Sequence, residues 1–273
     1  MEYIKLNNSV TIPQLGLGVF RTQEGEQTEN AVSWALESGY THIDTAMIYG
    51  NESSVGNVIA RSGVKRRNLF VTTKLWNEDI RQHRAKEAFE ESLDRLGMDY
   101  VDLYLIHWPA DGWQDAWQTM VELYNERRIR AIGVSNFQIH HLEELERLGT
   151  GVVPAVDQIE SSPQFNNNEV IDYCKSHGIA VEAWSPLGGT GGSLLTNPEL
   201  AAIGAQYGKS AAQVVIRWHL QRGVIVLPKS THEQRICQNI DVFDFTLTDD
   251  DMKAINALET GKRNGSDPDT FDF

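Results

Sequence analysis

The sequence predicts an α/β protein with the architecture of a closed (β/α)8 TIM barrel, a single domain over residues 1–273. Short apolar runs rich in β-formers alternate with longer segments of helical period, which is typical of βα units around a parallel sheet. Eight such alternations occupy about 250 residues, the usual length of a barrel whose active site lies at the C-terminal mouth. An open doubly wound sheet is the alternative that the same alternation allows.

Eight apolar runs of strand length define the expected barrel. In chain order they are Leu15–Val19, Thr41–Asp44, Leu69–Thr73, Val101–His107, Ala131–Val134, Ala155–Ile159, Ala180–Ala183 and Val224–Leu227.

Helices are expected between these strands, where apolar residues recur at helical spacing. A last helix should begin after Thr248, because a threonine followed three residues later by an acidic residue, here Asp251, favours a capping box. The glycine-rich segment Leu187–Ser193 is expected to be a mobile loop and not a domain boundary.

Composition narrows the class of protein. The net charge of −14 would repel nucleic acid and anionic membrane surfaces, so neither is an expected partner. Two cysteines are too few for a disulfide framework, and there is no signal peptide or run of about 18 apolar residues. We therefore expect a soluble cytoplasmic protein, monomeric, that acts on small molecules.

Four complementary side chains follow three consecutive strands. Asp44 ends the second strand, Tyr49 lies in its loop, Lys74 follows the third strand and His107 ends the fourth. A tyrosine with a pKa of about 10 holds its proton at neutral pH, and a nearby ammonium is expected to lower that pKa. Asp44 would keep Lys74 charged, and His107 would orient a substrate carbonyl. Together they form a candidate proton donor aimed at a carbonyl oxygen.

Each of these residues also has a structural interpretation. A single tyrosine or histidine at a strand end is often structural, and an Asp–Lys pair is commonly a solvated salt bridge. The coincidence of four complementary groups at neighbouring strand ends favours the chemical interpretation.

Eight short motifs occur in order along the chain. They are LGLGVF at Leu15–Phe20, HIDTAMIYGNE at His42–Glu52, TTKLW at Thr72–Trp76, DLYLIHWP at Asp102–Pro109, IGVSNF at Ile132–Phe137, DQIE at Asp157–Glu160, WSPLG at Trp184–Gly188 and LPKSTHEQRICQN at Leu227–Asn239. With these motifs the chain resembles the aldo-keto reductases from end to end. The resemblance implies that Tyr49 is the general acid, that Lys74 and Asp44 set its proton affinity, and that His107 orients the carbonyl.

The resemblance also implies a nicotinamide cofactor, which would stack on Trp184. NADPH is favoured over NADH, because its 2′-phosphate requires cations and hydroxyl donors. Lys229, Ser230 and Arg235 can provide these groups. The expected cofactor contacts are Ser135, Asn136 and Gln158 with the carboxamide, Ser185, Leu187 and Gly188 along the pyrophosphate, Lys229, Ser230 and Arg235 with the 2′-phosphate, Asn239 with adenine, and also Gly18.

The substrate is expected to be a small-molecule carbonyl compound. Phe20, Trp76 and Trp108 follow strands one, three and four, so together with His107 they are the expected substrate-binding residues. The tail Arg263–Phe273 is similar to that of microbial 2,5-diketo-D-gluconate reductases, which implies small aldehydes, ketoaldehydes or keto-sugars.

Two alternatives remain open at this point. Glu160 and Glu182 are a carboxylate pair of the kind that a barrel glycoside hydrolase uses. A member of the resembled family can also be a nucleotide-sensing or structural protein without turnover. No metal site is expected, because adjacent histidines such as His140 and His141 rarely face one ion and the acidic run at 249–251 is better explained as a helix N-terminus.

Overall fold

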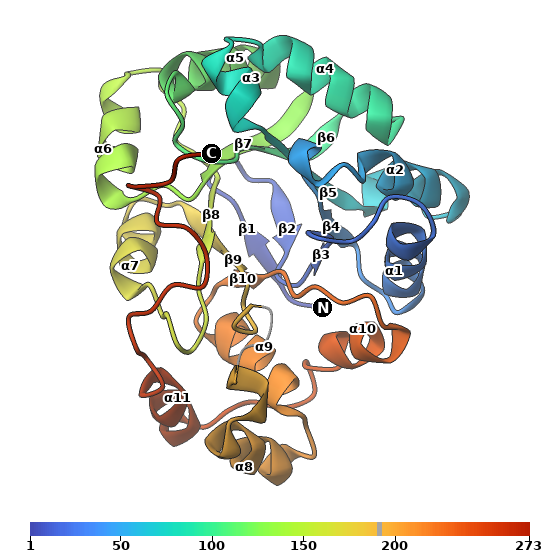
Figure 1. The fold of residues 1–273 in the computed structure, drawn as a ribbon, viewed down its shortest axis with the longest axis vertical. Coiled ribbons are helices and arrows are strands. Elements are labelled where there is room, and N and C mark those ends of the chain that lie inside the picture. Colours follow the sequence, from blue (N-terminus) through green and yellow to red (C-terminus); the bar gives the residue numbers. More distant parts are fainter. Residues whose placement is uncertain (190–192) are drawn as a thin grey trace.

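A computed structural model of the protein describes residues 1–189 and 193–273. The barrel strands are β3 (Leu17–Gly18), β4 (His42–Asp44), β5 (Phe70–Leu75), β6 (Val101–Ile106), β7 (Ile129–Ser135), β8 (Val156–Glu160), β9 (Ala180–Trp184) and β10 (Ile225–Val226). They form one parallel sheet in sequence order, each strand paired with the next (Figure 1).

The two ends of this sheet also meet. Leu15 and Val226 form a parallel bridge, and the amide of Gly16 donates to the carbonyl of Val226 at 3.0 Å. The sheet therefore closes, which confirms the barrel prediction over the open alternative. Closure places the ends of all eight strands around one mouth.

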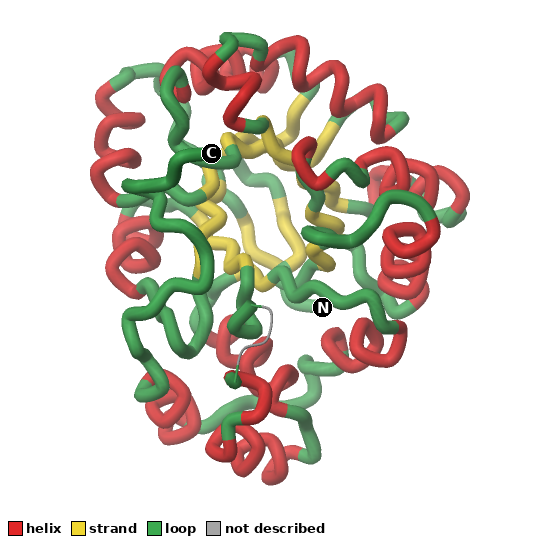
Figure 2. The backbone as a smooth tube through the Cα atoms, in the orientation of Figure 1, coloured by secondary structure: helices red, strands yellow, loops and turns green. Residues whose placement is uncertain are grey.

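Helices surround the strands on the outside (Figure 2). They are α1 (Glu26–Glu37), α2 (Glu52–Arg61), α3 (Asn77–Arg81), α4 (Ala85–Leu96), α5 (Trp113–Asn125), α6 (Ile139–Arg147), α7 (Asn168–Ser176), α8 (Pro198–Tyr207), α9 (Ala211–Gln221), α10 (Glu233–Ile240) and α11 (Asp249–Asn256). Short 3-10 helices cover Met47–Tyr49, Arg66–Asn68 and Leu194–Thr196.

The helices are held by apolar faces that pack on the outside of the strands. In α4, Ala88, Phe89 and Leu93 recur at helical spacing and are buried. The ring of Phe89 meets that of Tyr104 from β6 edge-on, with centroids 5.0 Å apart. Burial of such side chains contributes roughly 1.5–3 kcal/mol each, so packing and not local propensity holds these helices in place.

An N-terminal hairpin was missed by the sequence analysis. It consists of β1 (Tyr3–Lys5) and β2 (Thr11–Pro13), paired antiparallel. Leu6 and Ile12 of this hairpin segment join a buried cluster with inward-facing strand residues such as Leu103. Strands of three residues give too short an alternation to be recognised from sequence.

The other expectations agree with the structure except at element ends. The first and last barrel strands are shorter than expected, while β5 and β7 extend further. The capping box predicted at Thr248 is confirmed, since its hydroxyl accepts from the Asp251 amide and the Asp251 carboxylate accepts from the Thr248 amide.

Part of the predicted glycine-rich loop, residues 190–192, lies outside the described residues. Among the described helices, none has the length and apolar character needed to cross a membrane.

Candidate active site

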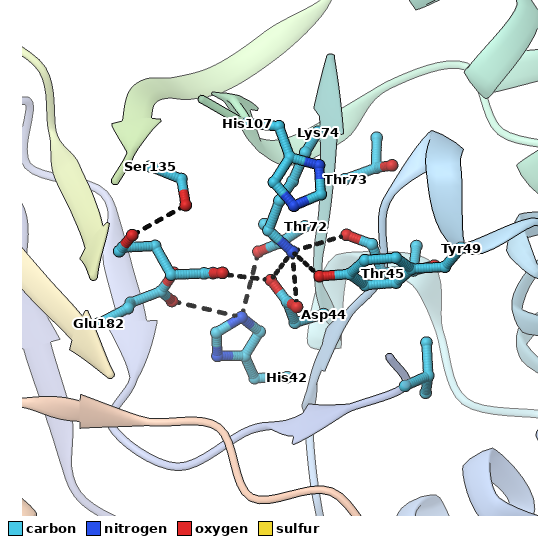
Figure 3. A network of polar contacts seen from close by, with 12 residues as sticks. His42, Asp44, Thr45, Tyr49, Thr72, Thr73, Lys74, His107, Ser135 and Glu182 are labelled. Carbon is cyan, nitrogen blue, oxygen red and sulfur yellow. Dashed lines mark hydrogen bonds and ion pairs between the residues drawn. The ribbon is translucent and has the colours of Figure 1, made fainter. Parts of the chain in front are cut away.

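The four predicted catalytic residues meet at the mouth of the barrel (Figure 3). Asp44 is the last residue of β4, Lys74 lies in β5, His107 directly follows β6, and Tyr49 ends the short 3-10 helix after β4. Asp44 pairs with Thr72 in the β4–β5 register. Because strand side chains alternate, Lys74 lies on the same face of β5 as Thr72, one step nearer the mouth.

The ammonium of Lys74 is fully buried and makes four contacts. Its Nζ lies 2.7 and 2.9 Å from the two carboxylate oxygens of Asp44, 3.0 Å from the carbonyl oxygen of Thr45 and 3.4 Å from the hydroxyl of Tyr49. An ammonium can only donate hydrogen bonds, so the Tyr49 oxygen is the acceptor in this contact. The proton of Tyr49 is therefore left to be donated elsewhere.

Burial determines the protonation states at this site. Burial alone would lower the pKa of Lys74, but the charge of Asp44 and its hydrogen bond to the ammonium help to raise it overall, so the amine stays charged. Burial raises the pKa of Tyr49, although Lys74 acts to lower it. The expected lowering by the Lys74 ammonium is present, but the loss of water around the phenol outweighs it, so the pKa of Tyr49 is raised overall. Burial and the charge of Lys74 lower the pKa of His107 well below its usual value, so this imidazole is neutral at pH 7.

The side-chain amide of Asn136 connects three other predicted site residues. Its Nδ2 donates to the His107 carbonyl at 3.0 Å and to the Ser135 hydroxyl at 3.1 Å, while its Oδ1 accepts from Trp184 Nε1 at 2.8 Å. Asn136 and Ser185 both have positive φ, 64° and 49°, an unusual conformation that clusters at functional sites. The amide of Asn136 is thus committed within the protein, and a carboxamide contact from it requires exchange of one of these bonds.

Two further carboxylates lie close to the predicted site, and both already accept hydrogen bonds from groups of the protein. Glu160 accepts from the backbone amides of Asn264 and Gly265 at 2.6 and 3.1 Å, which holds the C-terminal tail beside Trp184. Glu182 is fully buried inside β9 and accepts from Gln158 at 2.9 Å. This geometry gives no support to the glycoside hydrolase alternative, which needs both carboxylates to flank a substrate.

Two of the predicted 2′-phosphate contacts, Lys229 and Ser230, lie near Gly18, where β3 and β10 end. The amide of Gly18 donates to the carbonyl of Pro228, which precedes Lys229 and the buried Ser230. Burial and the charge of Arg21 lower the pKa of Lys229, so these two cations lie near one another in an otherwise acidic protein.

Other predicted cofactor residues lie on two neighbouring segments. Arg235 is exposed on α10 and Asn239 is buried on the same helix. Ser185 and Gly188 form a turn in which the Gly188 amide donates to the Ser185 carbonyl at 3.0 Å, with Leu187 half-buried between them. Arg21 was not among the predicted cofactor residues, although its place two residues after the expected first strand could have indicated it.

Aromatic rings form a continuous border beside the Tyr49 hydroxyl. The ring centroid of Tyr49 lies 5.0 Å from that of Phe20 and 5.7 Å from that of His107. Trp76 is 5.2 Å from His107, and Phe20 is 51% exposed, so its ring is accessible to a ligand.

The C-terminal tail completes this border. Phe273 stacks on Trp76 at 5.9 Å and meets Trp108 edge-on at 5.2 Å, while Phe271 also contacts Trp108. The main-chain oxygen of Phe273 accepts from Asn77 and from an arginine of α3. These tail contacts were not predicted by residue, because the segment has no periodicity from which to place it.

A cluster of three potential ligands lies outside this site. His140, His141 and Asp269 bring their side-chain donor atoms within 4.8 Å of one another, beside a cavity of about 430 Å³. His140 and His141 can therefore direct donor atoms at one point, although adjacent histidines rarely do so. However, His141 Nδ1 accepts a hydrogen bond from the Gln138 amide, so a metal bound at Nε2 would require an imidazolate. The prediction of no metal site stays a prediction.

The fold and this site define a parallel barrel with a buried lysine, a tyrosine whose hydroxyl accepts from that lysine, and a neutral histidine at its mouth. A model of the aldo/keto reductase family matches residues 14–260. The glyoxal reductase of Bacillus subtilis (strain 168) is 49% identical, over 100% of this chain and 98% of its own. Methylglyoxal reductase DkgA of Escherichia coli (strain K12) is 45% identical, over 98% and 97%.

A solved structure agrees with these matches. MGS-M4, an aldo-keto reductase enzyme from a Medee basin deep-sea metagenome library, has a TM-score of 0.96 at 45% identity and covers 99% of this chain and 100% of its own. The chain belongs to the aldo/keto reductase family and is an oxidoreductase of that family.

Proposed function

We propose that this protein is an NADPH-dependent carbonyl reductase with Tyr49 as its general acid. The proposal rests chiefly on one contact, the 3.4 Å approach of the buried Lys74 ammonium to the Tyr49 hydroxyl. The ammonium can donate to the phenol oxygen and stabilise negative charge that develops there when the proton leaves. Asp44 keeps the ammonium charged and aligned through both of its oxygens.

The residues at the mouth fit a nicotinamide cofactor. Trp184 offers a half-buried indole face, and Gln158 and Ser135 supply amide and hydroxyl groups for a carboxamide. Arg21 and Lys229 provide positive charge for phosphates in a chain whose net charge is −14. When bound, reduced nicotinamide supplies a hydride to the carbonyl carbon.

The protein's own residues supply the other half of the reaction. Neutral His107 donates a hydrogen bond to the carbonyl oxygen and orients it. Tyr49 gives its proton to the same oxygen as the carbonyl becomes an alcohol. Phe20, Trp76 and Trp108 exclude water around the reacting group.

Small dicarbonyl compounds are the substrates we propose to test first, because two relatives of this chain are named glyoxal and methylglyoxal reductases. The purified protein should oxidise NADPH when glyoxal, methylglyoxal or a 2,5-diketo sugar acid is added, followed by the loss of absorbance of the reduced cofactor. Binding of NADPH without oxidation by any aldehyde, ketone or keto-sugar would instead support a nucleotide-sensing role.

The preference for NADPH should depend on Lys229. Replacing Lys229 with methionine removes a charge-assisted hydrogen bond to the 2′-phosphate, so KM for NADPH should rise by about 10–100-fold while KM for NADH stays constant. Steady-state kinetics with both cofactors measure the ratio. Lys253→Met, on the exposed face of α11, is the matched control and should change neither value. Equal losses for NADPH and NADH would place Lys229 outside the 2′-phosphate site.

A further inference from the structure

The side-chain amide of Gln158 lies between two carboxylates from neighbouring strands. Its Nε2 donates to Asp44 Oδ2 and to Glu182 Oε2, both at 2.9 Å. An amide nitrogen carries two hydrogens, and these two bonds use both. Among residues 1–189 and 193–273, none donates to the remaining polar atom of this amide, Gln158 Oε1.

This arrangement allows only one orientation of the amide. Gln158 pairs with Glu182 in the β8–β9 register, and the Glu182 side chain is fully buried. A reversed amide would direct Oε1 at both carboxylates and leave buried acceptors without a donor, which is costly. The two carboxylates therefore hold Nε2 inward and leave Oε1 as the group that Gln158 can offer to a ligand.

Asp44 alone is a weaker restraint on Gln158. Both of its oxygens already accept from Lys74, and Gln158 shares Oδ2 with that ammonium. Glu182 has no such competing donor at Oε2 among the described residues, and its Oε1 lies 3.7 Å from His42 Nε2. Glu182 is thus the partner whose main role in this network is to hold Gln158.

We propose that Glu182 is a positioning residue that fixes the Gln158 side chain with its carbonyl oxygen toward the carboxamide of the nicotinamide, so that the site selects cofactors carrying an N–H donor there. This inference rests on the proposed nicotinamide function.

The protonation of Glu182 is compatible with this role. Burial and the charge of Asp44 raise the pKa of Glu182 to about 8, while Gln158 and Lys74 act to lower it. The proton is best carried on Oε1, since Oε2 accepts from Gln158. The neighbouring His42 is neutral, because burial lowers its pKa to about 3. Glu182 can therefore hold the amide in either protonation state.

The test compares binding of two oxidised cofactors, NADP⁺ and its 3-acetylpyridine analogue, in which a methyl group replaces the carboxamide NH2. Dissociation constants are measured by tryptophan fluorescence, without turnover. The wild type should bind NADP⁺ more tightly than the analogue. Glu182→Met should weaken NADP⁺ binding about tenfold and leave the analogue unchanged, so that the preference disappears.

Glu182→Gln is the matched control, because its side-chain oxygen can still accept from Gln158 and most of the preference should remain. The methionine variant is expected to fold, since the raised pKa of Glu182 leaves its carboxyl largely protonated at neutral pH, and its removal leaves one N–H of Gln158 without an acceptor but no unpaired charge. Glu182→Leu is the second apolar variant if it does not, and the same result is expected.

Two results would overturn the proposal in distinguishable ways. An unchanged preference in the folded apolar variants, or equal weakening of both cofactors, would remove the role of Glu182 and leave the cofactor assignment intact. Failure of the wild type to bind NADP⁺ or NADPH at all would overturn the proposed function itself, and this inference with it.

Discussion

Tyr49→Phe should lower kcat for carbonyl reduction by about 10²–10⁴-fold, the usual contribution of a general acid, while NADPH binds as in the wild type. The substitution removes the hydroxyl and keeps the ring, so the contacts with Phe20 and His107 should persist. Without the phenol the carbonyl oxygen has no positioned proton donor. Steady-state kinetics and fluorescence titration with NADPH measure the two quantities separately.

A matched control separates this effect from general damage. Tyr173→Phe removes a phenol from α7 on the outside of the barrel, and kcat should not change. A Tyr49→Phe variant that keeps its turnover within a factor of about three would show that another group protonates the substrate, and the proposed mechanism would be wrong.

The raised pKa of Tyr49 determines which protonation state the residue has before the reaction. Because burial raises that pKa, the phenol is fully protonated at neutral pH and does not act as a resting phenolate. In the proposed mechanism Lys74 therefore acts mainly after proton transfer, by stabilising the phenolate through the 3.4 Å contact. The sequence could indicate that an ammonium lies near the phenol, but not how much water surrounds it.

The barrel could be predicted because its signal is repeated. All eight barrel strands were found from apolar runs and turn residues, since each is buried on both faces and reads as a continuous apolar segment. The β1–β2 hairpin gave no comparable signal, being two strands of three residues. Most of the predicted strand ends differ from the observed ones by one or two residues. Backbone pairing decides where a strand stops, and this pairing cannot be read from the sequence.

Site residues could be predicted from the sequence only where a reactive side chain also stands at the end of a predicted strand. Asp44, Lys74 and His107 stand at strand ends, so a closed barrel brings them together whatever the details of register. Glu182 lies inside a strand, and a shift of one residue would turn it away from the interior. Its contact with Gln158 could therefore be recognised only in the structure. The tail residue Phe273 reaches the site from far along the chain, and no local pattern predicts that path.

Lys74→Met should abolish most activity and also destabilise the fold, by about 3–5 kcal/mol, because it leaves a buried carboxylate without its counter-ion. Asp44 is nearly inaccessible to water and would retain only the Gln158 amide as a strong donor. Asp44→Asn should cost a similar amount, since it leaves the buried ammonium without a negative partner. Urea unfolding measures the stability, and NADPH oxidation measures the activity.

The double variant Asp44→Asn with Lys74→Met distinguishes the structural role of this pair from its chemical role. Removing both charges relieves the unpaired-charge penalty, so the double variant should be more stable than either single variant, with a coupling energy of at least about 2 kcal/mol. Its turnover should nevertheless stay as low as that of Lys74→Met, because no cation remains to stabilise the Tyr49 phenolate. Recovery of activity together with stability would mean that Lys74 only maintains the fold, and the 3.4 Å contact with Tyr49 would then have no part in catalysis.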